Sequence, residues 1–303
     1  MRKQFCDAML QRSANPKMAF LTGDLGFMAL EPLQKALGER FINAGIAEQN
    51  MLSVAAAMSK TGMEIWVYSI APFCYARAFE QIRNDVAFHA LPVKIVGNGG
   101  GYGYGVQGPT HHSIEDYGVM LTLPGMQACI PVFDEDLELA VSWIAKNHSP
   151  TYLRLGRGEQ PVGFQIPSFE PWRLLIEGKG PVVVACGPLA STYIASVQTM
   201  AESIRPNLWA VSVLPLEISP PHPEMLRQLT QTGRLIVAEE HVQRSGLGSE
   251  LILWLAERGL SPRRFTHLYA KAHRFERYGS QNYLRAQSKL DPRSLLESLN
   301  LLK

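Results

Sequence analysis

Residues 40–68 read RFINAGIAEQNMLSVAAAMSKTGMEIWVY, and this stretch decides the fold class. The short apolar runs at 40–43 and 64–68 predict strands. Residues 46–60 are rich in alanine and methionine and contain no proline or glycine, which predicts a helix that Gly62 closes. A strand, a helix and a second strand in this order are the unit from which parallel sheets are built.

The same alternation continues on both sides of this stretch. Further strands are predicted at 17–22, 92–97, 129–132 and 151–155, with helices at 76–88, 113–122 and 134–146. A second alternating unit has strands at 181–186, 208–213, 234–238 and 265–269, and helices at 189–204, 223–230, 246–257 and 291–302. The stretch 157–180, rich in glycine and proline, separates the two units and is predicted to be irregular.

This pattern predicts an α/β protein with two consecutive open, mostly parallel sheets. We expect the first domain at residues 1–165, a linker at 166–177 and the second domain at 178–303. The chain has 303 residues, a length that suits two domains.

Composition excludes several classes of protein. The apolar fraction is 46% and the charged fraction 18%, which is unlike a disordered chain. The 29 basic and 27 acidic residues leave a net charge of +2, which gives no electrostatic case for nucleic acid or an anionic membrane. No signal peptide or membrane span is recognisable, so we expect a cytoplasmic protein. Neither a zinc site nor a disulfide framework is expected from the four dispersed cysteines, Cys6, Cys74, Cys129 and Cys186.

A glycine-rich loop follows the strand predicted at 92–97. Gly103, Gly105 and Gly108 have the spacing GxGxxG, but Pro109 follows the third glycine and no helix opens within the motif. This context is unlike a dinucleotide-binding fingerprint. The glycines are better explained by a tight turn or by a backbone that approaches a ligand closely.

The segment THHSIED at 110–116 holds several polar side chains that could bind a metal or a substrate. Its spacing matches no familiar zinc signature. Ser113 and Asp116 are spaced like a capping box, which predicts a helix start with polar caps. A histidine used in an active site at a loop-to-helix junction is the alternative.

Three further side chains have two interpretations each. Glu48 lies in the first turn of an apolar helix, where it either complements the helix dipole or serves as a desolvated carboxylate for proton exchange with a ligand nitrogen. Phe73 follows a strand end and is either a core residue or a stacking surface for a ligand. Arg157 also follows a strand and forms either a salt bridge or a phosphate clamp.

Taken together, these stretches resemble the transketolase family. GIAEQNM at 45–51 and GPTHH at 108–112 carry the resemblance. It extends in order and spacing through GDLG (23–26), FEQIRNDVAF (79–88), VAEEH (237–241) and GLGS (246–249). The similarity covers nearly the whole chain and implies a pyrimidine-binding domain followed by the transketolase C-terminal domain.

The family's diphosphate-binding motif, Gly-Asp-Gly…Asn, is absent from this sequence. The chain therefore resembles the C-terminal subunit of a split transketolase. The resemblance implies an N-terminal partner subunit, an α₂β₂ assembly and a thiamine diphosphate shared between the two subunits. The partner would bind Mg²⁺, and no metal site is expected in this chain. The implied reaction transfers a two-carbon ketol unit from a ketose, or ketose phosphate, to an aldose.

The resemblance also assigns roles on the cofactor side. Glu48 matches the family's catalytic glutamate, which hydrogen-bonds N1′ of the aminopyrimidine and promotes its imino tautomer. Phe73 matches a phenylalanine that stacks on the pyrimidine. Asp24 matches an acidic residue near the cofactor, and Arg77, a neighbour of Phe73 in the sequence, is expected on the cofactor side as well.

On the substrate side, His111 matches a catalytic histidine near the C1 and C2 oxygens of the donor sugar. Arg157 and Arg2 match arginines that hold a sugar phosphate. Gln107 stands where pentose-phosphate transketolases carry an aspartate that contacts a substrate hydroxyl. The sequence departs from that type again at Gly99, in place of a histidine, and at Met28, in place of a serine. An unusual sugar or an unphosphorylated acceptor is therefore as compatible with the sequence as a common sugar phosphate.

Other functions remain open at this point. A β subunit of a 2-oxoacid dehydrogenase E1 has the same two-domain layout and would pass acyl groups to lipoyl arms. A 1-deoxyxylulose-phosphate-synthase-like activity is a third enzyme hypothesis. A non-catalytic assembly subunit that keeps only the fold is the alternative from a different class.

Overall fold

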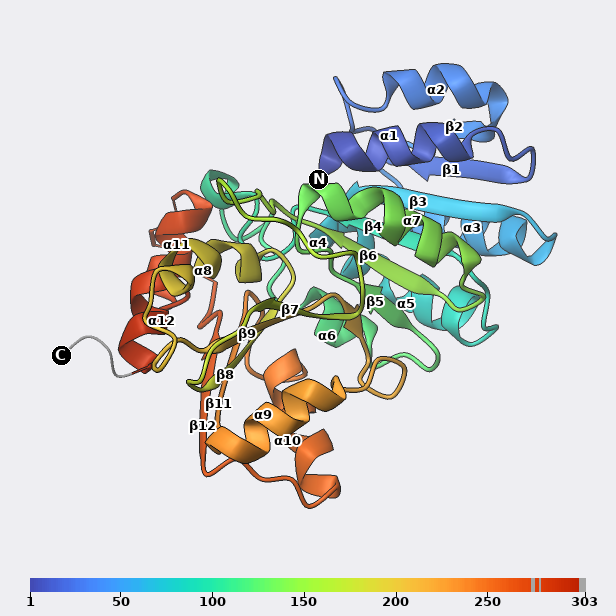
Figure 1. The fold of residues 1–303 in the computed structure, drawn as a ribbon. Helices are drawn as coiled ribbons and strands as arrows, with labels where there is room; N and C mark the ends of the chain where they lie inside the picture. Colours follow the sequence, from blue (N-terminus) through green and yellow to red (C-terminus); the bar gives the residue numbers. More distant parts are fainter. Residues whose placement is uncertain (274–275, 278, 300–303) are drawn as a thin grey trace.

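The computed structural model describes residues 1–273, 276–277 and 279–299, and it contains two sheets, each covered by helices on both faces (Figure 1). The predicted fold class is therefore confirmed. The first sheet has the order β10-β5-β6-β4-β3-β1-β2 and consists of β1 (Met18–Thr22), β2 (Phe41–Asn43), β3 (Glu64–Ile70), β4 (Lys94–Asn98), β5 (Gln127–Cys129), β6 (Thr151–Leu155) and β10 (Val213–Leu214). The second has the order β12-β11-β8-β9-β7 and consists of β7 (Trp172–Ile176), β8 (Val182–Cys186), β9 (Asn207–Val211), β11 (Arg234–Glu239) and β12 (Arg264–Tyr269).

The helices of the described residues cover both faces of the two sheets. They are α1 (Arg2–Arg12), α2 (Glu31–Leu37), α3 (Glu48–Lys60), α4 (Ala71–Tyr75), α5 (Phe79–Gln81), α6 (Asp116–Met120), α7 (Leu137–Lys146), α8 (Leu189–Gln198), α9 (Pro223–Thr232), α10 (Leu247–Glu257), α11 (Gln281–Gln287) and α12 (Pro292–Ser298).

Alternate residues of each buried strand face opposite helices. In β1, Phe20 lies in an apolar cluster with α1 and α7, whereas Leu21 lies in a cluster with α3. In β8, Val183 lies with α8 and α12, and Val184 lies with α9 and α10, which cover the other side of the sheet (Figure 1). Strands buried on both faces read as continuous apolar runs, which is why MAFLT and VVVAC predicted parallel strands.

The irregular stretch predicted at 157–180, and the linker predicted at 166–177 within it, are wrong in one respect. Residues 172–176 form β7, which pairs antiparallel with β9 at the edge of the second sheet. The residues around β7 are rich in glycine and proline, and its hydrogen-bonding partner, β9, comes later in the chain. The local sequence therefore gives little sign of this strand.

The two halves are also less separate than predicted. Val213 and Leu214 leave the second half and pair antiparallel with Cys129 and Ala128 at the edge of the first sheet. One apolar cluster contains side chains from both sheets, including Ile130, Val184 and Leu214. The limits of the two domains remain a prediction.

Several helix boundaries differ from the predictions. The helix expected at 76–88 is divided into α4, α5 and a π-helical turn, Ile82–Ala87, and α4 begins earlier because Pro72 occupies its first turn. The helix expected at 113–122 begins only at Asp116, because the backbone of Ser113 pairs with Gly101 in both directions. The predicted capping box is therefore wrong.

The helix expected at 189–204 ends at Gln198, and the Arg205 guanidinium then binds the Met200 carbonyl oxygen. The helices α1, α2 and α11 were not predicted from the sequence at all. The tail helix expected at 291–302 is α12 as far as Ser298, and its last predicted residues, 300–302, lie outside the described residues.

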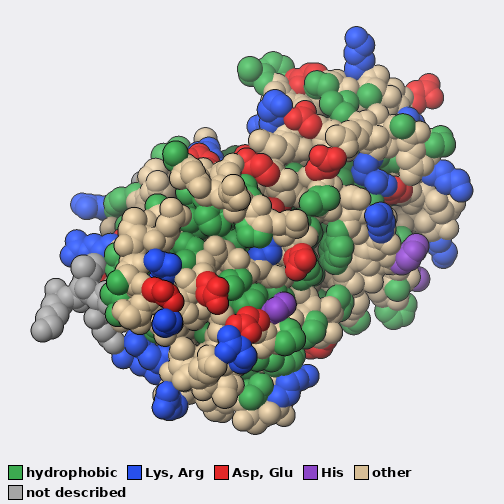
Figure 2. Space-filling model, in the orientation of Figure 1, with side chains coloured by type: hydrophobic (Ala, Val, Ile, Leu, Met, Phe, Trp, Pro, Cys, Tyr) green, Lys and Arg blue, Asp and Glu red, His purple; other side chains and the backbone are tan. Residues whose placement is uncertain are grey.

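On the face drawn in Figure 2, basic and acidic side chains lie among one another. Within the described part of the chain, no helix has the length and hydropathy that a membrane crossing requires. Nor do three histidine, cysteine or acidic side chains of that part gather closely enough to hold a metal ion.

Glu250 in α10 gives the first testable prediction. Burial raises the pKa of Glu250 to about 7, although its Oε1 accepts a hydrogen bond from the Leu216 amide at 2.5 Å. The folded protein therefore binds this proton more tightly than the unfolded chain, whose glutamate has the ordinary pKa of 4.5. The free energy of unfolding should fall as the pH rises from about 4.5 to about 7 and then level off.

Glu250→Gln should remove this dependence and raise the free energy of unfolding at pH 8 by about 2 kcal/mol. The midpoints of urea unfolding at pH 5 and pH 8 measure this pH dependence. The matched control is Glu257→Gln, which makes the same change at an exposed position. Equal pH dependence in wild type and Glu250→Gln contradicts the assignment.

Candidate active site

The predicted site residues lie at one edge of the first sheet. Strands β1 to β6 run parallel, so their carboxyl ends share this edge. Glu48 begins the helix after β2, and Phe73 and Arg77 follow β3. His111 lies in the loop after β4, and Arg157 follows β6. Ligands of open α/β sheets bind at this edge, where loops from neighbouring strands converge.

Glu48 is a buried carboxylate at the N-terminus of α3, with 2% of its surface exposed. Its Oε2 accepts a hydrogen bond from Arg77 Nη1 at 2.7 Å. Its Oε1 is 3.4 Å from the hydroxyl of Ser69, which lies in β3. The N-terminal end of the helix dipole favours the negative charge at this position. The structure therefore keeps Glu48 out of water and fixes its orientation with Arg77.

Phe73 and His111 join the same cluster. The Arg77 guanidinium lies over the Phe73 ring, 4.6 Å from its centroid. The Phe73 and His111 rings meet edge to face with their centroids 5.4 Å apart. Glu48, Arg77, Phe73 and His111 thus form one continuous set of contacts, from three segments that are far apart in the sequence.

Asp24 lies at the rim of this cluster. Its side chain is exposed and accepts a hydrogen bond from Asn43 Nδ2 at 3.1 Å. Asn43 Oδ1 in turn accepts from the Gly45 amide, and the Asp24 amide donates to the Gly45 carbonyl. Asp24 therefore holds the turn that leads into α3 and Glu48.

The two arginines predicted on the substrate side lie on neighbouring segments. Arg2 donates from Nη2 to the Phe27 carbonyl at 2.6 Å. The Gly156 amide contacts the Met1 sulfur at 3.2 Å, which brings Arg157 close to the start of α1. Arg157 is exposed and lines a cavity of about 500 Å³ together with Arg285, Gln281 and Thr192.

Gln107 ends a 3₁₀ turn, Gly105–Gln107, and its side chain is exposed. That side chain forms no hydrogen bond with a described residue. Its predicted place on the substrate side stays a prediction.

Sequence reasoning missed Tyr104 and Asn98. Tyr104 contacts His111 edge to face, with ring centroids 5.8 Å apart. Its hydroxyl accepts a hydrogen bond from Asn98 Nδ2 at 2.7 Å. The signal in the sequence was a pair of tyrosines, Tyr102 and Tyr104, in a loop otherwise rich in glycine.

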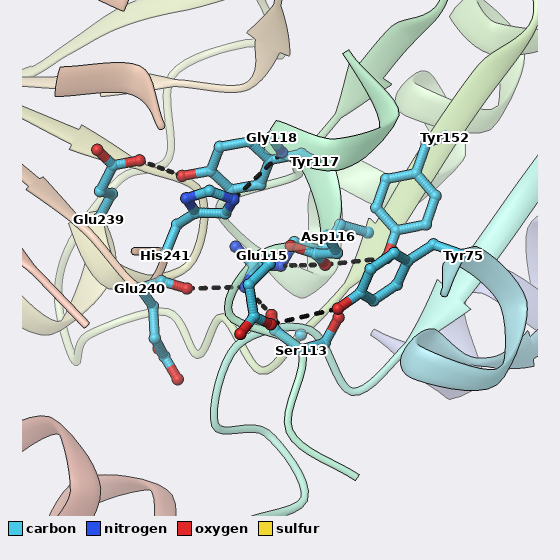
Figure 3. A network of polar contacts seen from close by, with 12 residues as sticks. Tyr75, Ser113, Glu115, Asp116, Tyr117, Gly118, Tyr152, Glu239, Glu240 and His241 are labelled. Carbon is cyan, nitrogen blue, oxygen red and sulfur yellow. Dashed lines mark hydrogen bonds and ion pairs between the residues drawn. The ribbon is translucent and has the colours of Figure 1, made fainter. Parts of the chain in front are cut away.

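A polar chain behind the cluster was also missed. Tyr75, in the same helix as Phe73, donates to Glu115 Oε2 at 3.2 Å (Figure 3). His273, from the second half of the chain, contacts Glu115 Oε1 at 2.6 Å. Burial raises the pKa of the Glu115 carboxyl, but the hydrogen bonds from His273 and Tyr75 and the charges of His273 and His241 together outweigh burial and lower this pKa. The second half of the chain therefore supports the helix that carries Phe73.

Arg154 and Asp116 form a buried ion pair beside this chain. Arg154 Nε lies 3.0 Å from Asp116 Oδ2, and both side chains are at most 5% exposed. Arg154 also donates to the carbonyls of Ser113 and Glu240, at 2.9 and 2.8 Å. Because Glu240 follows a strand of the second sheet, Arg154 ties the two halves together; the surrounding network is drawn in Figure 3.

Comparison with known proteins identifies the family of this chain. The pyrimidine-binding domain of transketolase matches residues 13–162. An apulose-4-phosphate transketolase subunit from Phocaeicola vulgatus is 31% identical over 264 residues, which are 84% of this chain and 83% of that protein. The chain belongs to the transketolase family. Two further transketolase relatives are similar over most of their length.

A 6-deoxy-6-sulfo-D-fructose transketolase subunit from Clostridium sp. strain MSTE9 is 28% identical over 264 residues, covering 85% of this chain and 81% of that subunit. The solved structure of a split-gene transketolase, an inactive β4 tetramer, is 30% identical with a TM-score of 0.83. The two chains overlap over 99% and 96% of their lengths. This transketolase chain therefore has the fold of a split β subunit.

Transketolases depend on thiamine diphosphate, and the residues present fit its aminopyrimidine ring. Glu48 Oε1 has only the 3.4 Å hydrogen bond from Ser69 among the described residues, which leaves it able to share a proton with a ligand nitrogen. Gly23 places no side chain beside this oxygen; an added Cβ would lie 3.6 Å from it. Arg77 covers one face of Phe73, so a stacked heterocycle must use the opposite face.

Proposed function

We propose that this chain is the β-type subunit of a split, thiamine-diphosphate-dependent transketolase. It would transfer a two-carbon ketol unit from a ketose donor to an aldose acceptor, together with a separate subunit that holds the diphosphate and Mg²⁺. The observation that carries the proposal is the cluster in which Arg77 holds the buried Glu48 carboxylate beside Phe73 and His111. Similarity to split subunits over most of the chain supports it.

Each residue of the cluster has a role in this proposal. Bound thiamine diphosphate supplies the carbanion chemistry of the transfer. Glu48 shares a proton with a pyrimidine ring nitrogen, donating it as the carboxylic acid and taking it back as the carboxylate, shielded from water. Arg77 fixes the carboxylate, and Phe73 offers its free face for stacking. His111 Nε2 has no hydrogen-bond partner among the described residues and is placed to contact the oxygens of the donor sugar.

We propose a ketose with an anionic end as the substrate class. Two of the relatives are named for apulose 4-phosphate and 6-deoxy-6-sulfo-D-fructose, which carry a phosphate and a sulfonate. Arg2 and Arg157 are cations near the same edge of the sheet in this chain. Guanidinium groups bind tetrahedral oxyanions through paired hydrogen bonds.

The partner subunit would cover the apolar rim of the site. Phe27, Met28 and Ile46 are 82%, 83% and 82% exposed, although water-exposed phenylalanine and isoleucine are uncommon. Phe27 and Met28 lie in the loop after β1 that also holds Asp24, and the Phe27 carbonyl accepts a hydrogen bond from Arg2. Ile46 lies in the loop that leads to Glu48. We therefore place the interface with the diphosphate-binding subunit here, within an α₂β₂ assembly.

Purification with the native partner tests this function. The tagged chain is isolated from its source cells, and its co-purifying proteins are identified by mass spectrometry. We expect a stoichiometric subunit with the Gly-Asp-Gly…Asn motif, and ketol transfer that requires both subunits, Mg²⁺ and thiamine diphosphate. The isolated chain should bind thiamine diphosphate weakly in calorimetry. Tight, stoichiometric binding by the isolated chain, or a complex with no cofactor-dependent turnover, contradicts the proposal.

Arg157→Ala tests the anionic substrate class. In the two-subunit enzyme we expect KM to rise about tenfold for D-ribose 5-phosphate and by less than about twofold for D-ribose, because only the former loses a phosphate contact. Steady-state kinetics with the two acceptors measure the difference. An equal change for both sugars identifies Arg157 as a structural residue.

A further inference from the structure

Tyr104 occupies the space that a side chain at position 99 would fill. Gly99 follows β4 with a φ of +79°. A Cβ added to Gly99 would lie 2.1 Å from Cε2 and 2.2 Å from Cδ2 of Tyr104. The glycine therefore allows the Tyr104 ring to lie directly on the backbone at the end of β4, in the middle of the site's edge.

The surroundings of Tyr104 connect the two ends of the proposed substrate channel. On one side its ring meets His111, with centroids 5.8 Å apart. Burial raises the pKa of the Tyr104 phenol, and the hydrogen bond from Asn98 and the charge of Arg2 oppose this rise. Gly99, against which the Tyr104 ring lies, donates from its amide to the Leu155 carbonyl. The neighbouring Gly156 amide contacts the Met1 sulfur, so Tyr104 lies on the side of the site where α1 and Arg2 begin.

The Tyr104 hydroxyl has a hydrogen to donate. Its oxygen already accepts from Asn98 Nδ2 at 2.7 Å, which fixes the position of the phenol. No described residue accepts the hydroxyl hydrogen. The Tyr104 hydroxyl is therefore a half-buried donor in a fixed position, and it can donate a hydrogen bond to an oxygen atom of a ligand.

We infer that Tyr104 is a specificity-determining residue that donates a hydrogen bond to a hydroxyl in the middle of the ketose. The inference rests on the proposed function, which places the ketol carbons at His111 and the anionic end at Arg2. The chain between these ends carries hydroxyl groups, and a neutral phenol is matched to them. A site that is built to hydrogen-bond a substrate hydroxyl discriminates strongly in favour of substrates that have it.

Tyr104→Phe in the two-subunit enzyme tests this role, because it removes the hydroxyl and keeps the ring over Gly99. The donors are D-xylulose 5-phosphate, apulose 4-phosphate, 6-deoxy-6-sulfo-D-fructose and hydroxypyruvate, each with D-ribose 5-phosphate as acceptor. Hydroxypyruvate supplies the ketol unit without any hydroxyl beyond it. We expect kcat/KM to fall about 10- to 100-fold more for the ketose donors than for hydroxypyruvate.

The control is Tyr269→Phe, which removes a tyrosine hydroxyl on β12, in the second sheet. This variant should leave the ratio of kcat/KM for the ketose donors to kcat/KM for hydroxypyruvate at the wild-type value. A Tyr104→Phe enzyme with the wild-type ratio overturns the inference, and so does a wild-type enzyme that uses hydroxypyruvate alone. A wild-type enzyme that turns over none of the four donors overturns the proposed function itself, and the inference with it.

Discussion

Replacement of Glu48 by glutamine is expected to lower the kcat of the two-subunit enzyme by a factor of about 10²–10⁴. The amide retains the shape of the side chain and can still accept a hydrogen bond from Arg77. It cannot take up a proton from a pyrimidine nitrogen. Because Glu48 is 2% exposed, water cannot readily replace it as a proton acceptor. The loss should therefore appear in the chemical step and not in substrate binding.

Steady-state and single-turnover kinetics separate these effects, and gel filtration with circular dichroism checks folding and assembly. The matched control is Glu80→Gln, which makes the same chemical change at an exposed position in α5. The control should have wild-type kinetics. If Glu48→Gln keeps more than about a tenth of the wild-type kcat, the catalytic assignment of Glu48 is wrong.

Arg154→Met should destabilise the protein by about 3–5 kcal/mol, the largest effect on stability that we expect. The substitution leaves the Asp116 carboxylate buried without the cation that lies 3.0 Å away. It also removes the hydrogen bonds that Arg154 donates to the carbonyls of Ser113 and Glu240, although the Ser113 carbonyl still accepts from the Gly101 amide. Methionine fills similar space, so the loss comes from charge and hydrogen bonding, with little contribution from a cavity.

Urea denaturation followed by circular dichroism and tryptophan fluorescence measures this loss. The control, Arg293→Met, breaks a surface pair with Glu297 in which the arginine is 80% exposed. Exposed pairs contribute about 0–1 kcal/mol, so the control should unfold near the wild-type midpoint. Equal midpoints for the two variants contradict a structural role for the buried pair.

Much of the fold could be predicted because the buried strands are locally distinctive. Val182–Cys186 and Met18–Thr22 are buried along their whole length and read as uninterrupted apolar runs. Glu48 could be placed at a helix start from the apolar run that follows it, and the structure confirms that position. In contrast, Trp172–Ile176 became a strand only through pairing with β9, which its own glycine- and proline-rich surroundings do not reveal.

The sequence by itself determined the α/β class, the order of most strands and helices along the chain, and the place of Glu48 in the first turn of a helix. Only the tertiary structure decided which side chains meet: Arg77 on Glu48, Phe73 against His111, and Tyr104 over Gly99. The physical reason is that the spacing of apolar residues shows which face of a helix or strand is buried. That spacing can be read from residues close together in the chain. Hydrogen bonds, ion pairs and ring contacts depend on loops from separate strands that converge at one edge of a sheet, and no local pattern encodes those distances.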